Sequence, residues 1–219
     1  MNGGQRLQRV KKPKIKETNP ASTNDDAPIT TPLSNLLNPI GKAYAISGPL
    51  TNYAFDLIGL INQQRVRYGL PALQTEGCLN EGAEKISAWN ASLNIMQHTA
   101  NMPNNLGKYC QSNWAGLGEI ISRNPRQDIR ETMFSVCLPT GCVTPADPNT
   151  IDYRTISQEG RSYMASPSHR NVILDGKWHR IGAGAYIGDN GYLFTSGWFM
   201  QCTLDSNKNP NCGVPPAAK

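Results

Sequence analysis

Two stretches of the chain place apolar residues at helical spacing. The first predicts a helix that begins at Thr51 or Asn52 and ends at Gly69, with an apolar face formed by Leu57, Ile58, Ile61 and, less regularly, Val66. The second predicts a helix from about Thr75 to Asn94, with an apolar face formed by Leu79, Ala83, Ile86 and Trp89 or Asn90. Asn90 also opens an Asn-Ala-Ser glycosylation pattern, which we expect to be unused inside a helix.

Alternating and continuous apolar runs near the end of the chain predict a β-hairpin. The runs IGAGAYIG and YLFTSGWFM flank Asp189-Asn190, with Gly188 and Gly191 on either side. Between the helices and this hairpin we expect a short strand over 116–122, a helix over 126–136, a cysteine-held loop over 137–153 and a helix over 156–164 that Pro167 interrupts. Helices first and strands last predict an α+β domain with helices packed on an antiparallel sheet.

Composition divides the chain into three parts. Residues 1–50 hold 6 of the 16 prolines and little periodic hydrophobicity, which indicates an extended arm, while residues 51–202 form the domain and residues 203–219 a polar tail. Between Met1 and Pro20 lie six basic residues and one acidic residue, so this segment carries a charge equal to the net +5 of the whole chain. A basic arm on a neutral body indicates docking onto an acidic neighbour, such as adjoining protein subunits. The arm lacks interleaved aromatic residues, which argues against nucleic acid as the partner.

Six cysteines indicate disulfides and an oxidising destination: Cys78, Cys110, Cys137, Cys142, Cys202 and Cys212. Several pairings are open. We favour Cys78–Cys110, Cys137–Cys142 and Cys202–Cys212, because the last two close short loops that contain proline or glycine.

The expected location is extracellular or in a virion. No run approaches the ~18 apolar residues that a membrane span needs. The first 20 residues are basic without an apolar core, so no signal peptide is visible. Either a signal was removed, or the protein leaves the cell by another route. An initiator-like Met1 favours the second route, and a particle component released by lysis would satisfy these expectations.

Four motifs, in the right order along the chain, resemble the CAP superfamily of cysteine-rich secretory proteins, antigen 5 and pathogenesis-related class-one proteins, especially its bacterial branch. They are LIGLINQQRVRYGLPAL (57–73), AEKISAWNASLNIMQHT (83–99), GLGEII (116–121) and SPSHRNVILDGKWHRIGAGAY (166–186). The third motif departs from the family pattern at Ile120, where asparagine is usual. The resemblance covers about residues 52–202 and implies a three-layer α-β-α sandwich.

The resemblance also implies a cleft lined by two histidines and two acidic groups. The matching positions are His98, Glu119 and His169. At the place of the second acid stands Ser166, with Tyr163 in the aromatic position before it. Glu159, about one helical turn earlier, does not match the motif, but we expect it to reach toward the cleft. Two imidazoles and a carboxylate are suitable ligands for a divalent metal such as zinc, or they stabilise the cleft floor by hydrogen bonds.

Two functions of different class follow. The first is a non-enzymatic binding or attachment module, a structural piece of an extracellular particle such as a phage tail or virion, with a host-surface protein, lipid or glycan as partner. The second is a metal-assisted hydrolase of cell-envelope material that uses His98, His169 and Glu119. A secreted defence or signalling protein is a third alternative. We expect binding rather than turnover. Ser166 and Ser168 flank His169, but no G-x-S-x-G elbow supports a serine hydrolase.

Overall fold

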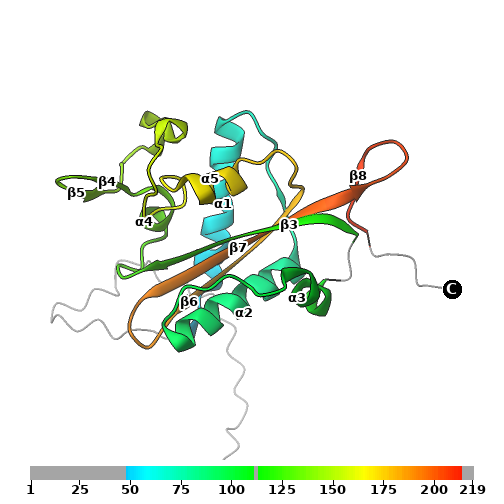
Figure 1. Ribbon diagram of the computed structural model, residues 1–219, viewed down its shortest axis with the longest axis horizontal. Helices are drawn as coiled ribbons and strands as arrows, with labels where there is room; N and C mark the ends of the chain where they lie inside the picture. Colours follow the sequence, from blue (N-terminus) through cyan, green and yellow to red (C-terminus); the bar gives the residue numbers. More distant parts are fainter. Residues whose placement is uncertain (1–47, 111–112, 214–219) are drawn as a thin grey trace, which may run out of the picture. The chain divides into compact units, whose positions relative to one another are not determined.

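A six-stranded sheet forms the centre of the structure, a computed structural model that describes residues 48–110 and 113–213 (Figure 1). Its main path runs β1 (Gly48–Pro49), β6 (Arg180–Ile187), β7 (Leu193–Leu204) and β3 (Trp114–Asn124), all antiparallel. β2 (Gln74–Thr75) pairs with β6 in parallel, and β8 (Pro210–Asn211) pairs with β7. The predicted hairpin is therefore confirmed as β6 and β7.

Helices cover both faces of this sheet. α2 (Gly77–Leu93) and α3 (Met102–Tyr109) lie on one face, and α1 (Thr51–Arg67), α4 (Ile129–Phe134) and α5 (Pro167–Ile173) on the other (Figure 1). Neighbouring residues of β7 serve opposite layers, because side chains alternate along a strand: Trp198 packs in the cluster of α2, and Phe199 in the cluster of α1. The α+β class and the three layers predicted for the chain are thus confirmed.

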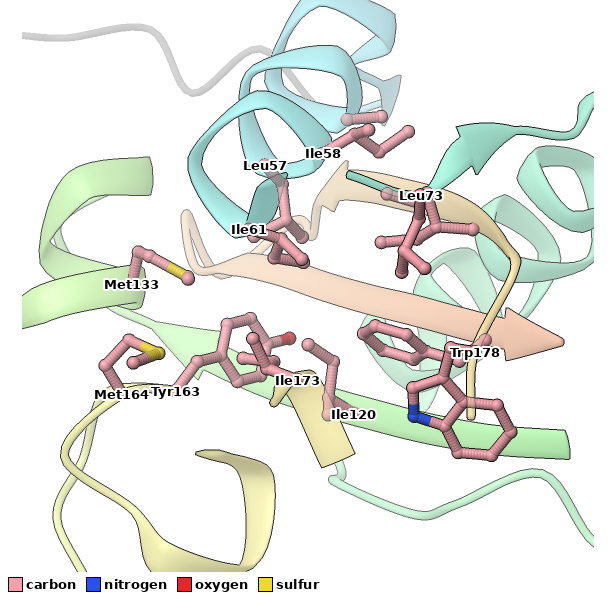
Figure 2. Close-up of a cluster of buried hydrophobic side chains, with 14 of the residues drawn as sticks. Leu57, Ile58, Ile61, Leu73, Ile120, Met133, Tyr163, Met164, Ile173 and Trp178 are labelled. Atoms are coloured by element: carbon pink, nitrogen blue, oxygen red, sulfur yellow. The ribbon is translucent and has the colours of Figure 1, made fainter. Parts of the chain in front are cut away.

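The larger apolar cluster lies on the α1 side of the sheet. Figure 2 shows Leu57 and Ile61 of α1 above the sheet, with Ile120 of β3 and Ile173 of α5 close by. Val66, expected on the same face of α1, is 61% exposed instead. Its place is taken by Arg65, which is fully buried and donates to the carbonyls of Pro71, Ile173 and Asp175.

The first motif owes its pattern to the end of α1. Gly69 has φ +78°, a left-handed backbone that favours glycine, and its N–H bonds to the carbonyl of Val66. The next N–H, that of Leu70, bonds to the carbonyl of Arg65, which completes a Schellman motif. Asn62 exchanges two hydrogen bonds with the backbone of Leu73. These motif residues therefore hold the turn after α1.

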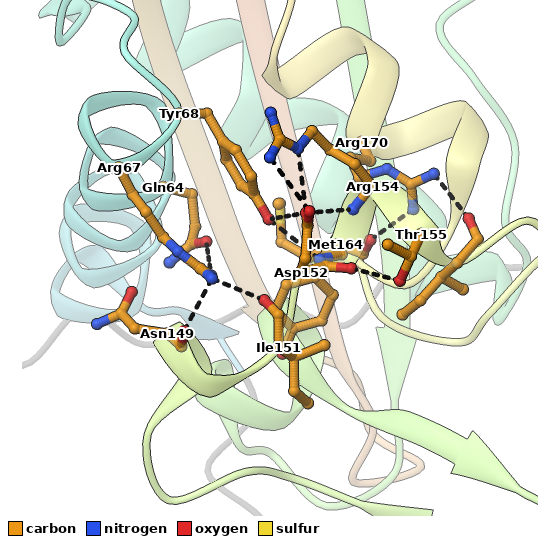
Figure 3. A network of polar contacts seen from close by, with 12 residues as sticks. Gln64, Arg67, Tyr68, Asn149, Ile151, Asp152, Arg154, Thr155, Met164 and Arg170 are labelled. Carbon is orange, nitrogen blue, oxygen red and sulfur yellow. Dashed lines mark hydrogen bonds and ion pairs between the residues drawn. The ribbon is translucent and has the colours of Figure 1, made fainter.

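The helix predicted over 156–164 is wrong. The N–H groups of Tyr163 and Met164 bond to the carbonyls of Thr132 and Met133, outside their own segment. Arg170 occupies the carbonyls of Ile156 and Met164 (Figure 3). Tertiary hydrogen bonds thus replace the helical ones, and Pro167 opens α5 instead of interrupting an earlier helix.

The region expected as a cysteine-held loop has local structure of its own. β4 (Val136–Leu138) and β5 (Gly141–Val143) form a small hairpin, followed by the 3-10 turns η2 (Pro148–Thr150) and η3 (Tyr153–Thr155). Arg67 of α1 donates to the carbonyls of Pro148, Asn149 and Ile151, which fastens this region to the helix (Figure 3).

The sheet extends beyond both expected domain boundaries. β1 adds residues 48–49 on one side, and β8 together with the Cys202–Cys212 disulfide adds residues up to 212 on the other. The other favoured disulfides, Cys78–Cys110 and Cys137–Cys142, are also present. The rest of the arm, residues 1–47, lies outside the described residues, as do residues 214–219. None of the helices in the described ranges is long and apolar enough to cross a membrane.

Candidate functional site

The turn after α2 delivers His98 to the sheet. α2 ends at Leu93, and the C-cap residue Asn94 reverses the chain with a left-handed φ of 51°. One turn earlier, the buried amide of Asn90 donates to the carbonyl of Gln97 and accepts from its N–H, both at 3.0 Å. Asn90 is 3% exposed and bonded at both ends, in agreement with an unused glycosylation pattern. Its amide fixes the backbone immediately before His98.

Glu119 of β3 lies at the centre of the site. It stands opposite Trp198 of β7 in the strand register, so both side chains point to the α2 face. Its Oε2 accepts from Nδ1 of His98 at 2.7 Å and from the N–H of Thr99 at 2.8 Å. Its Oε1 accepts from the Thr99 hydroxyl at 2.6 Å and from the Trp198 indole N–H at 2.9 Å. Four donors therefore surround one carboxylate whose side chain is 6% exposed.

The charges of this pair reinforce each other. Burial by itself would raise the pKa of Glu119, but the hydrogen bonds from His98 and Thr99 outweigh it and lower the pKa. The hydrogen bond to Glu119 raises the pKa of His98, against a smaller opposing effect of burial. With its Nδ1 proton on Glu119, His98 keeps Nε2 for other contacts, and its side chain is 59% exposed.

His169 lies on α5, on the other side of β3 from α2. Its ring packs edge-on against Tyr163, with centroids 5.3 Å apart. Burial lowers the pKa of His169; the charge of Glu159 opposes this effect, and the charge of His98 adds to it. The structure thus joins His98 directly to Glu119. Among the described residues, the His169 ring instead contacts Tyr163, and it makes no hydrogen bond to His98, Glu119 or Glu159.

Glu159 is held at the start of α5. Its carboxylate accepts from the N–H of Ser168 at 3.2 Å. Ser166 caps the same helix, accepting from the N–H of His169 at 3.4 Å, and its hydroxyl contacts that of Ser168 at 2.9 Å. These serines are therefore occupied by the helix start and by each other.

The residues do not fit a metal site as they stand. Among residues 48–110 and 113–213, no group of three or more His, Cys, Asp or Glu side chains is arranged to hold a metal ion. The zinc site considered for His98, His169 and Glu119 is therefore not assembled among the described residues.

A cavity of about 440 Å³ opens beside His98, in the range of small-ligand sites. It lies between α2, the 97–100 turn, α3 and Trp198. Its lining residues are Gly82, Lys85, Ile86, Trp89, Gln97, His98, Thr99, Ala100, Asn105, Tyr109 and Trp198. A methyl group at position 82 would overlap the Trp198 ring, so glycine there lets the indole lie against α2.

Several residues of this site were not predicted from the sequence. Trp198 looked like an ordinary core residue of a strand, and Asn90 like an unused glycosylation site. Lys85 lies within the second motif without an assigned role, and Asn105 and Tyr109 lie outside all four motifs. Thr99 was visible only as the last letter of the second motif. Trp89, which the helical spacing offered for the apolar face as an alternative to Asn90, is 41% exposed and lines the cavity instead.

Comparisons with known proteins bear on the fold. No family model and no curated protein matches the chain. Among solved structures, it is similar to an outer surface protein of Borrelia burgdorferi at 14% identity, covering 71% of this chain and 98% of that one, with a TM-score of 0.49. It is also similar to a cysteine-rich secretory protein of Staphylococcus aureus at 16% identity, covering 73% of this chain and 40% of that one, with a TM-score of 0.46.

An extracellular protein of Bacillus anthracis that contains an SCP domain is similar at 18% identity, covering 71% of this chain and 45% of that one, with a TM-score of 0.46. The chain thus spans less than half of these last two proteins. The neighbours include the cysteine-rich secretory group that the four motifs resemble. This likeness concerns the fold alone.

Proposed function

We propose that the domain is a non-enzymatic binding module whose binding surface is the cavity beside His98. The four hydrogen bonds to Glu119 carry this proposal. They join the 98–99 turn, β3 and β7 through one buried carboxylate. A cavity wall held in this way is organised before a ligand arrives, which lowers the entropy lost on binding.

The same contacts argue against Glu119 itself as a general base or nucleophile. Such a group must reach the substrate with a free acceptor, whereas the Glu119 oxygens are surrounded by four donors. The serines beside His169 hydrogen-bond to each other and to the start of α5. Among the described residues, neither serine hydroxyl hydrogen-bonds to a histidine ring. The serine–histidine hydrogen bond that a serine hydrolase needs is therefore not formed.

The test separates binding from hydrolysis on one sample. The full chain is incubated with purified cell walls and with short peptides, with and without a chelator. We expect the protein to sediment with the cell walls and to release no soluble fragments from the cell walls or the peptides. Chelator-sensitive release that is lost in both His98→Ala and His169→Ala would instead support the metal-assisted hydrolase.

We further propose that the basic arm, residues 1–50, attaches this module to a larger extracellular particle such as a phage tail or virion. The support is the placement of charge, since the excess of basic residues falls within the first 20 positions. The three disulfides agree with an oxidising destination.

The arm is tested by incorporation into particles. Deletion of residues 1–47 leaves β1 in place, so the domain keeps its sheet. We expect the deleted chain to remain in the soluble fraction. We also expect a variant with the six basic residues of positions 1–20 changed to glutamine to incorporate poorly. Normal incorporation of the deleted chain would end the anchoring proposal.

A further inference from the structure

The cavity beside His98 has aromatic walls. Trp89 of α2 stands at its mouth, and Tyr109 of α3 and the ring edge of Trp198 also line it. Tyr109 and Trp198 meet edge to face, with ring centroids 6.3 Å apart at 67°. This pairing fixes two of the three rings, while Trp89 offers an exposed face to a ligand.

Polar side chains also line this cavity. Gln97 and Asn105 contribute amides, and Lys85 contributes an ammonium group. The amide of Asn105 donates to the carbonyl of Ala100 at 2.7 Å, which ties α3 to the 97–100 turn and leaves that amide a second N–H. Of the residues that line the cavity, none is acidic. The cavity therefore favours a ligand with hydrogen-bonding groups and a negative charge.

Resting on the proposed binding function, we propose that this cavity binds a carboxylate-bearing sugar unit of a glycan. One C–H face of the sugar ring lies on Trp89. The ring hydroxyls meet the amides of Gln97 and Asn105. The carboxylate pairs with the ammonium of Lys85, a charge-assisted contact that a neutral sugar cannot make.

The lining favours a sugar over an acyl chain. A hydrocarbon chain is best covered by aliphatic side chains in an enclosed channel. Here Ile86 is the one large aliphatic residue among those that line the cavity, and three aromatic residues with two amides make up half of the other ten. Flat rings and amides together suit a ligand that is apolar on one face and hydroxylated at its rim.

The primary experiment uses two disaccharides that differ by a single carboxylate, cellobiouronic acid and cellobiose. Binding to the full chain is followed by tryptophan fluorescence, since Trp89 and Trp198 line the cavity, and by calorimetry. We expect the acid to bind about threefold to fivefold more tightly than the neutral sugar, as one partly exposed ion pair provides. Failure of both sugars to bind at millimolar concentration would overturn the proposal.

Variants locate the site. Trp89→Ala should weaken both sugars about tenfold, because the stacking face is lost. Lys85→Gln should remove the preference for the acid and leave cellobiose unaffected. Leu93→Ala, an exposed apolar residue one turn along the same helix, and Lys208→Gln, an exposed lysine outside the cavity, serve as matched controls. Equal effects of controls and test variants would contradict the assignment.

A last experiment distinguishes failure of the proposed ligand class from failure of the proposed binding function. If dodecanoate binds and displaces 1-anilinonaphthalene-8-sulfonate while neither sugar does, the ligand class is wrong but the binding module stands. If the chain instead degrades cell-wall material in a chelator-sensitive way, the proposed function itself is wrong. All of the variants keep the buried core, and circular dichroism verifies their folding.

Discussion

At the scale of single residues, the Glu119 carboxylate shows how a buried charge is tolerated. Removing a carboxylate from water is costly unless hydrogen bonds replace the lost hydration. Three residues, His98, Thr99 and Trp198, supply four such bonds from two different segments. The charge therefore orders the turn that carries His98 as well as the strand pair beneath it.

Glu119→Gln should destabilise the fold by about 1–3 kcal/mol, because its amide would leave at least one of the four donors without an acceptor. Urea unfolding measures the loss. In the same variant the pKa of His98 should fall, since its largest upward cause is the hydrogen bond to Glu119. A histidine pKa unchanged by NMR titration would show that the contact does not form in solution.

The pair should also give stability a defined pH window. The pKa of Glu119 is lowered on folding, so its contribution is present above the ordinary value of 4.5 and is lost as the pH falls through the folded pKa. The pKa of His98 is raised, so its contribution is present below 6.5 and is lost as the pH rises through the folded pKa. The stability difference between wild type and Glu119→Gln should therefore be largest between pH 4.5 and 6.5. A difference that is flat with pH would contradict this coupling.

At the scale of elements, irregular segments are held by side chains that bond to backbone groups. Arg67 fastens the region after β5 to α1, Arg170 fastens the chain before α5, and Asn90 fastens the turn after α2. Each supplies hydrogen bonds that helices and strands otherwise provide for themselves.

Asn90→Ala should loosen the 95–99 turn while α2 remains helical. The loss leaves the N–H and carbonyl of Gln97 without their side-chain partner, at a cost of about 1–3 kcal/mol. Amide hydrogen exchange should increase over residues 95–99 and stay unchanged in α1. Ser92→Ala, an exposed change two residues away, is the control. Unchanged exchange in the turn would show that Asn90 does not hold it.

At the scale of the molecule, the sequence predicts those features that periodicity and turn residues encode locally. α1, α2 and the β6–β7 hairpin carry such signals. The contact of His98 with Glu119 spans 21 positions and was expected only through the family motifs. The role of Trp198 depends on which strand lies opposite β7. The helix expected over 156–164 failed because hydrogen bonds from α4 and α5 outweighed local preference.

The Cys78–Cys110 disulfide joins the start of α2 to the residue after α3 across a separation of 32 positions. Replacing both cysteines with alanine should cost about 3–4 kcal/mol in unfolding free energy. It should also weaken ligand binding, because α2 and α3 both line the cavity. The matched control is Cys137–Cys142, with a separation of 5 in the small β4–β5 hairpin; its loss should cost about 2 kcal/mol and leave binding intact. Equal effects on binding would contradict this division.

The two faces of α2 have different surroundings. Leu79 and Ala83 face the sheet and are fully buried, whereas Lys85 and Trp89 are exposed and line the cavity. Substitutions at exposed positions usually change stability little. On the proposed binding function, substitutions at positions 85 and 89 should therefore change the ligand specificity of the cavity, while the sheet-facing residues of α2 preserve the fold.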